Sequence, residues 1–262
     1  MIGDAREAPL LEVRGLSRAF GGLNAVDDLS FSVQRNLIHG LIGPNGAGKT
    51  TTFNLISGFY PPTGGRIFYE GRDITGTRTS VLAQSGLIRT FQGTTLFQEF
   101  SVLDNVRVGC HLSARAGILA RIAGADAARE RAADEKACEV LSFFDLAGFA
   151  DEPTSSLPHG HQRALGMAVA LAADPKLLLL DEPFTGMNAE ETRRMMGHVR
   201  QLRDERGITI MLVEHDMQAV MGLCDRITVM NFGSALTEGS PEEVRSDPRV
   251  IEAYLGRPSH AA

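Results

Sequence analysis

A glycine-rich run that ends in lysine and threonine is the segment of this sequence with the clearest chemistry. It spans residues 43–50, follows the apolar segment 37–42 and precedes a helical pattern over residues 51–57. In such a loop the backbone N–H groups can point at phosphate oxygens, and the helix after it directs its positive end at the same place. Lys49 can reach the β- and γ-phosphates, and the Thr50 hydroxyl can hold Mg²⁺. The phosphate-binding positions are Gly43, Pro44, Asn45, Gly46, Ala47, Gly48, Lys49, Thr50 and Thr51.

Two adjacent carboxylates supply what such a loop needs for hydrolysis. Asp181 and Glu182 follow the apolar segment 177–180, which is typical of a buried strand. Ligands of open α/β sheets bind at the carboxyl ends of strands, where Asp181 stands. Asp181 is placed to hold the metal through water, and Glu182 is placed to polarise the attacking water. The combination predicts hydrolysis of a nucleoside triphosphate.

The elements that must position these residues alternate between strands and helices. Residues 177–180 and 208–213 are expected to form buried strands, with a helix over 190–205 between them. Short strand patterns come first in the chain, and residues 101–149 are rich in alanine and charge at helical spacing. We therefore expect an α/β fold: a P-loop NTPase core with a mainly parallel sheet, a small antiparallel β-subdomain and an inserted α-helical subdomain.

Composition narrows the classes of protein that the chain can be. Its 262 residues are 43% apolar, and a net charge of −6 argues against nonspecific nucleic-acid binding as the main activity. The first nine residues lack the apolar core of a signal peptide, and the longest apolar runs are too short to span a bilayer. Any membrane role is therefore expected to go through partner subunits. The three cysteines lack metal-ligand spacing and are expected to be reduced, buried thiols.

With these motifs the chain resembles the ATP-binding subunits of ABC transporters, over roughly residues 10–256. In that family an aromatic on an early strand stacks on adenine, and Phe20 matches it. Gln92 matches the glutamine that contacts Mg²⁺ and water and couples to the membrane subunits. His215 matches the switch histidine that contacts the γ-phosphate and orients the catalytic glutamate. The resemblance thus implies Glu182, His215, Gln92 and Lys49 as catalytic residues, and Thr50, Gln92 and Asp181 as metal ligands.

The family signature, usually Leu-Ser-Gly-Gly-Gln, departs from its pattern at residues 157–162. Pro158 replaces the serine whose hydroxyl bonds the γ-phosphate, and His159 replaces the first glycine. Gly160 remains, ahead of a helix expected over about 161–173, and the resemblance implies that it faces the nucleotide held by another subunit. A hydrogen bond to a charged oxygen is worth about 1.5–3 kcal/mol. The missing hydroxyl is therefore expected to affect how strongly this segment holds the nucleotide of the other subunit. His159 or His161 could replace the missing serine hydroxyl as a hydrogen-bond donor. A role in packing is expected equally for both.

Four short segments are similar to sequences of one branch of the family, the importers of branched-chain amino acids and related small solutes such as urea or amides. These segments are residues 89–92, 186–188, 213–217 and 250–256. The ATPase of lipopolysaccharide export shares several of them. The resemblance implies ATP and Mg²⁺ as cofactors and a peripheral location on the cytoplasmic face of the cell membrane. Its implied partners are integral-membrane permease subunits, a second identical or homologous ATP-binding subunit and, indirectly, an extracytoplasmic solute-binding protein, with no nucleic acid.

We expect residues 10–256 to form the ATP-binding domain, with the helical subdomain at about 93–165 and tails at 1–9 and 257–262. Two other classes of protein fit the sequence less well. A soluble ABC-type ATPase acting on chromosomes or ribosomes would carry long coiled coils or a second P-loop, and the sequence has neither. A P-loop kinase would need an acceptor pocket and lid, whereas the insert after Gln92 matches the ABC helical subdomain.

Overall fold

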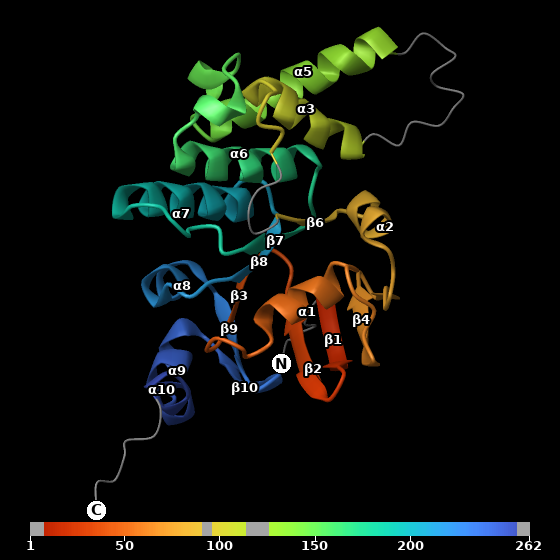
Figure 1. Cartoon of the computed structure of the whole chain (residues 1–262), viewed down its shortest axis with the longest axis vertical. Coiled ribbons are helices and arrows are strands. Elements are labelled where there is room, and N and C mark those ends of the chain that lie inside the picture. Colours follow the sequence, from red (N-terminus) through yellow and green to blue (C-terminus); the bar gives the residue numbers. More distant parts are fainter. Residues whose placement is uncertain (1–7, 91–95, 114–125, 256–262) are drawn as a thin grey trace, which may run out of the picture.

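Two sheets and a layer of helices build the protein (Figure 1). A computed structural model describes residues 8–90, 96–113 and 126–255. Within them, the larger sheet has six strands in the order β10-β9-β3-β8-β7-β6, and only the β9–β10 pair is antiparallel. The predicted α/β class with a mainly parallel sheet is confirmed. The strands of this sheet are β3 (Ile38–Ile42), β6 (Leu87–Arg89), β7 (Leu177–Asp181), β8 (Thr209–Val213), β9 (Arg226–Asn231) and β10 (Ser234–Gly239).

The smaller sheet is antiparallel, with the order β2-β1-β4-β5, as the N-terminal strand patterns predicted. Its first two strands are much longer than the alternating patterns of the sequence. Register shifts between Val13 and Leu16 and again near Arg18 interrupt the alternation of apolar and polar residues. The sequence pattern of a strand is therefore lost before β1 ends. The strands are β1 (Leu11–Phe20), β2 (Leu23–Val33), β4 (Gly64–Tyr69) and β5 (Arg72–Asp73).

Helices α3, α5 and α6 lie together at the end of the molecule away from the small sheet (Figure 1). They bury a shared apolar face that includes Val106, Leu141 and Leu165, in the same core cluster as the strands β7 and β8. None of the described helices is long and apolar enough to cross a membrane. The helices are α1 (Lys49–Ile56), α2 (Thr79–Gln84), α3 (Val102–Ser113), α5 (Asp126–Phe143), α6 (His159–Ala172), α7 (Ala189–Asp204), α8 (Met217–Leu223), α9 (Pro241–Ser246) and α10 (Pro248–Leu255), with 3-10 turns at Ala147–Phe149 and Thr154–Ser156.

Two local expectations were wrong. Helix α6 begins at His159 rather than near 161, because Pro158 stands at the cap with extended ψ and the helix can start directly after it. Cys138 is exposed, whereas Cys110 and Cys224 are buried as expected. Ala137 and Leu141 point into the core from α5, and Cys138 is rotated out of that face by one helical step.

Buried His39 in β3 gives the core a pH dependence. Its Nε2 lies 2.8 Å from Thr228 Oγ1, and burial, with Arg226 nearby, lowers the pKa of His39 from 6.5 to about 3. The folded state binds this proton less readily than the unfolded chain does. The contribution of neutral His39 to the free energy of unfolding is therefore complete above pH 6.5 and is lost as the pH falls toward 3. We expect His39→Gln to remove a slope of up to about 1.4 kcal/mol per pH unit from the unfolding free energy in that range. Urea unfolding at several pH values measures the slope, and exposed His111→Gln is the control, which should leave it unchanged.

Candidate functional site

Three neighbouring strands end at one edge of the larger sheet, and each is followed by predicted site residues. β3, β8 and β7 lie side by side and run parallel, with Leu41 opposite Val213 and Val213 opposite Asp181. The glycine-rich loop follows β3, the Asp181–Glu182 pair ends β7, and His215 comes two residues after β8. The structure therefore brings these segments together at the carboxyl edge, as expected for an open α/β sheet.

The shape of the loop depends on glycines that approach other backbone closely. Gly48 has φ +100°, and a β-carbon there would lie 2.3 Å from the carbonyl oxygen of Ala25 in β2. Gly43 has φ +152°, and a β-carbon there would lie 2.2 Å from the Met230 carbonyl oxygen. Both distances are too short for any side chain. The loop therefore packs closely between β2 and β9. Its glycines allow the backbone to curve so that N–H groups can surround an anion.

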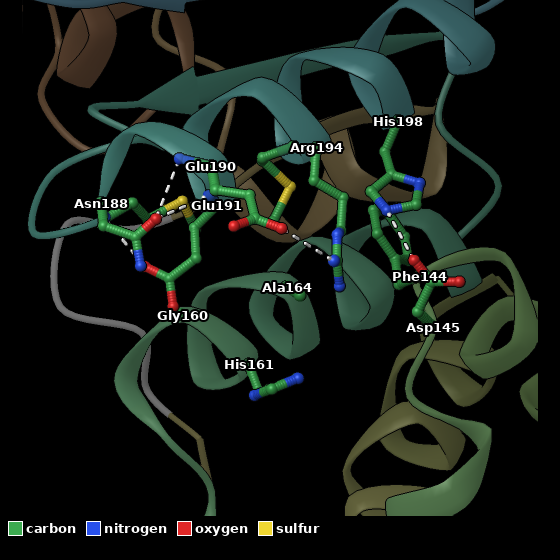
Figure 2. Close-up of a pocket in the computed structure, with 12 residues that line it drawn as sticks. Phe144, Asp145, Gly160, His161, Ala164, Asn188, Glu190, Glu191, Arg194 and His198 are labelled. Atoms are coloured by element: carbon green, nitrogen blue, oxygen red, sulfur yellow. Dashed lines mark hydrogen bonds and ion pairs between the residues drawn. The ribbon is translucent and has the colours of Figure 1, made fainter.

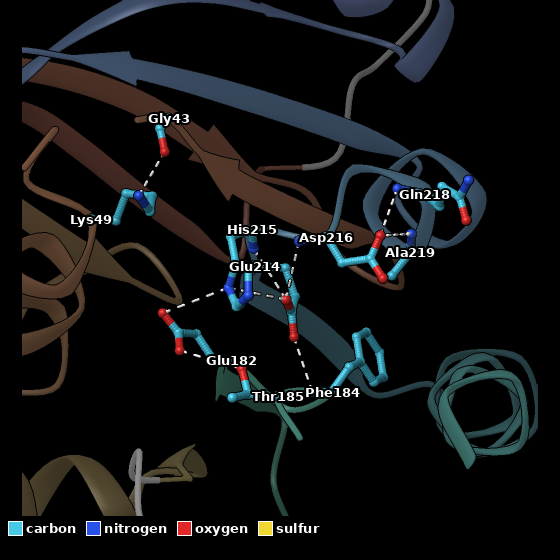
Figure 3. Close-up of polar contacts among 10 residues, drawn as sticks. All are labelled: Gly43, Lys49, Glu182, Phe184, Thr185, Glu214, His215, Asp216, Gln218 and Ala219. Carbon is cyan, nitrogen blue, oxygen red and sulfur yellow. Dashed lines mark hydrogen bonds and ion pairs between the residues drawn. The ribbon is translucent and has the colours of Figure 1, made fainter. Parts of the chain in front are cut away.

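Lys49 at the start of α1 folds over the loop (Figure 3). Its Nζ donates to the carbonyl oxygens of Gly43 at 2.6 Å and Pro44 at 3.0 Å. Burial lowers the pKa of Lys49, and the negative charge of Glu182 opposes that shift. The ammonium group therefore lies over the loop and within electrostatic reach of Glu182, where it could meet the terminal phosphates.

Asp181 has one carboxylate oxygen committed and one available. Its side chain is 2% exposed, and Oδ2 accepts a hydrogen bond from Arg89 at 2.7 Å. Oδ1 is buried and has no hydrogen-bond partner in the described part of the chain. No three His, Cys, Asp or Glu residues gather as a metal site among the described residues. Mg²⁺ needs no such cluster, because one or two carboxylates, water and phosphates commonly hold it. The buried, unpartnered Oδ1 of Asp181 and the exposed Thr50 are groups that fit that requirement.

Glu182 and His215 face each other across the strand ends (Figure 3). Glu182 Oε1 lies 3.9 Å from His215 Nδ1, and Oε2 accepts a longer hydrogen bond of 3.4 Å from Thr185 Oγ1. The backbone of Glu182 has φ +49°, a left-handed conformation that is uncommon for a non-glycine residue. This turn aims the carboxylate back toward Lys49 and His215, rather than along β7.

Glu214 is a further residue of the site, beyond those that the sequence motifs indicate. Its buried carboxylate accepts backbone N–H bonds from Phe184 at 2.9 Å, His215 at 3.1 Å and Asp216 at 3.5 Å (Figure 3). Burial raises the pKa of Glu214, while these donors oppose the shift. Glu214 thereby ties the turn after Glu182 to the turn that carries His215. The signal in the sequence was an acidic residue directly after an apolar strand, the same signal that identified Asp181.

Phe20 lies at the end of the small sheet that meets the loop. It pairs with Leu23 across the β1–β2 turn, and β2 continues to Ala25 against Gly48. The ring is 42% exposed and packs edge-on against Tyr60 at 5.8 Å between centroids. The guanidinium of Arg18 lies over the Phe20 ring at 4.7 Å. An exposed ring braced in this way has a free surface for stacking on a base.

Gly160 lines a cavity of about 240 Å³ between α6 and α7 that none of the P-loop residues lines (Figure 2). A β-carbon on Gly160 would lie 2.6 Å from Glu191 Oε1, and one on Gly186 would lie 3.0 Å from His159 Nε2. Asn188 and Glu191 form a reciprocal cap at the start of α7. His159 is therefore packed against the turn before α7. Gln92 falls outside the described residues.

Comparison with known proteins identifies the family. Residues 26–185 match the sequence family described as ABC transporter, and residues 236–260 match a family described as branched-chain amino acid ATP-binding cassette transporter. The chain is 42% identical over 250 residues to the high-affinity branched-chain amino acid transport ATP-binding protein BraF of Pseudomonas aeruginosa. It is 40% identical over 250 residues to the corresponding protein LivG of Escherichia coli K12. Each match covers 95% of this chain and 98% of the relative.

Solved structures give the same result. A nucleotide-free ATP-binding cassette from an ABC transporter superposes with a TM-score of 0.84 at 30% identity, over 95% of this chain and 100% of the other. The ADP conformation of an ABC transporter cassette gives 0.83 at 30% identity, over 95% and 99%. Family match, sequence identity and structure agree on one conclusion. The chain belongs to the ATP-binding subunits of ABC transporters, a family of ATPases.

Proposed function

We propose that this chain binds ATP with Mg²⁺ and hydrolyses it to power an importer of branched-chain or other small amino acids. The observation that carries the proposal is the meeting of the P-loop, the Asp181–Glu182 pair and His215 at the ends of three adjacent parallel strands. The match of residues 236–260 to a branched-chain amino acid transporter family favours this branch over its neighbours. Residues 10–256 would form the ATP-binding domain, with a helical subdomain at about 93–165.

In the proposed reaction Lys49 and the loop N–H groups bind the β- and γ-phosphates, while Phe20 stacks on the adenine. Thr50, Asp181 and Gln92 would hold Mg²⁺, which neutralises charge on the phosphates when bound. Glu182 accepts a hydrogen bond from the attacking water and polarises it toward the γ-phosphate. His215, beside Glu182, keeps that carboxylate oriented and contacts the γ-phosphate.

The proposed active unit contains two ATP-binding subunits. Gly160 lines a cavity against α7 that none of the P-loop residues lines, which suits a role toward a nucleotide held by another chain. The first turn of α6 would offer its backbone N–H groups to that γ-phosphate without the missing serine hydroxyl. The two ATP-binding subunits would lie at the cytoplasmic face of the membrane, where they close around ATP. Integral-membrane permeases would convert that closure into transport, and an extracytoplasmic solute-binding protein would deliver the solute.

Affinity capture of the tagged chain from detergent-solubilised native membranes tests these partners. We expect permease subunits, a second ATP-binding subunit and an amino-acid-binding protein to co-purify. Tagged Lys49→Ala is the matched control, since it should keep the membrane partners but lose nucleotide-dependent changes in the complex. Permeases of urea or amide uptake, or of lipopolysaccharide export, would contradict the proposed solute. Ribosomes or DNA without membrane proteins would contradict transport altogether.

A further inference from the structure

Arg89, the last residue of β6, makes a buried junction between two parts of the site. Its Nη2 donates to Asp181 Oδ2 at 2.7 Å. Its Nη1 donates to Asn54 Oδ1 at 2.7 Å and to Ser57 Oγ at 3.0 Å. Asn54 lies in α1, and Ser57 is the residue at which α1 ends. One guanidinium therefore joins the carboxylate at the end of β7 to the helix that begins with Lys49 and Thr50.

The pair is among the most buried ionic contacts in the described residues. The side chain of Arg89 is 5% exposed and that of Asp181 is 2% exposed. At this depth a charge is stable only when it is paired and hydrogen-bonded, and a mispositioned partner is costly. The planar, forked guanidinium suits such a junction, because it can hold acceptors in two directions at once. A lysine at this position would keep the charge but present a single nitrogen.

We propose that Arg89 is a positioning residue for the Mg²⁺ site. It orients Asp181 by one oxygen, leaves buried Oδ1 for the metal or its water, and fixes the spacing between that carboxylate and the helix that carries Thr50. The inference rests on the proposed role of Asp181 as a metal ligand. The alternative is that the pair only stabilises the packing of β6, β7 and α1, with no effect on the metal.

Binding of a fluorescent ADP analogue, titrated with and without Mg²⁺, separates these alternatives. We expect wild-type protein to bind the analogue more tightly with Mg²⁺. In Arg89→Lys this Mg²⁺-dependent gain should shrink by at least about 10-fold, since the carboxylate loses its fixed orientation. Affinity measured in EDTA should stay within about two-fold, because the P-loop contacts with phosphate are unchanged. A role in packing alone would lower the melting temperature and leave the Mg²⁺-dependent gain intact.

Two further variants sharpen the test. Asn54→Ala keeps the Arg89–Asp181 pair but removes one contact with α1, and we expect it to reduce the Mg²⁺-dependent gain by a smaller factor; it decides the question if Arg89→Lys fails to fold. Arg206→Lys is the control, because Arg206 pairs with Glu139 at 2.8 Å on an exposed surface. A full Mg²⁺-dependent gain in both Arg89→Lys and Asn54→Ala would overturn the role of Arg89. A wild-type chain that does not respond to Mg²⁺ would overturn the metal site itself and this role with it.

Discussion

Replacing Glu182 with glutamine is expected to lower the turnover rate of ATP hydrolysis by at least about 100-fold, while ATP still binds. The amide keeps the size of the side chain and its place beside His215 and Thr185. The neutral amide cannot stabilise the positive charge that develops on the attacking water. The rate of the chemical step therefore falls. The P-loop and Lys49, which are proposed to contact the phosphates, are unchanged.

Phosphate release at saturating ATP and equilibrium binding of a fluorescent ATP analogue measure the two effects separately. Glu130→Gln removes an exposed carboxylate from α5 and serves as the control. It should hydrolyse ATP at the wild-type rate. Wild-type turnover in Glu182→Gln would take Glu182 out of the assigned role, and loss of ATP binding would show that its main contribution is structural.

Replacing Gly48 with alanine is expected to lower the unfolding free energy by about 2–5 kcal/mol and nucleotide affinity by at least about 100-fold. The new β-carbon would lie 2.3 Å from the Ala25 carbonyl oxygen, and the backbone would be held at φ +100°. Because the obstacle is backbone of β2 rather than a flexible side chain, the loop itself must move. The N–H groups that are proposed to face the phosphates would move with it.

Gly46→Ala is the matched variant for this experiment. Gly46 lies in the same loop at φ +80°, but nothing lies within 4 Å of a β-carbon placed there. It should therefore cost only the conformational strain, about 1–2 kcal/mol, with a smaller loss of affinity. Thermal unfolding and nucleotide binding of both variants give the comparison. Equal losses at Gly46 and Gly48 would mean that the contact with Ala25 does not shape the loop.

The sequence was most informative where chemistry is encoded locally. The P-loop is a single continuous run, and Asp181 and His215 each follow an apolar strand, so their meeting at one sheet edge follows from parallel pairing. Gly160 is implied by the family resemblance instead, and α6 begins two residues before the expected start. The roles of these residues remain predictions, and Gln92 lies outside the described residues.

The contacts that the sequence could not reveal join residues that are far apart in the chain. Arg89 meets Asp181 across 92 positions and Asn54 across 35. Nothing in the local pattern around Arg89 indicates a buried partner, since an arginine at a strand end is usually solvated. The packing of His159 against Gly186 is hidden in the same way. Such pairings are set by how strands and helices stack, not by the periodicity of either segment.

ATP-driven uptake tests the central claim most directly. The complex captured with this chain would be reconstituted in vesicles, with radiolabelled leucine and the solute-binding protein outside and ATP with Mg²⁺ inside. We predict that leucine accumulates with the wild-type chain and that accumulation is lost with Glu182→Gln. Accumulation at the wild-type rate with Glu182→Gln would contradict the claim that this chain powers the transporter through hydrolysis at the site described.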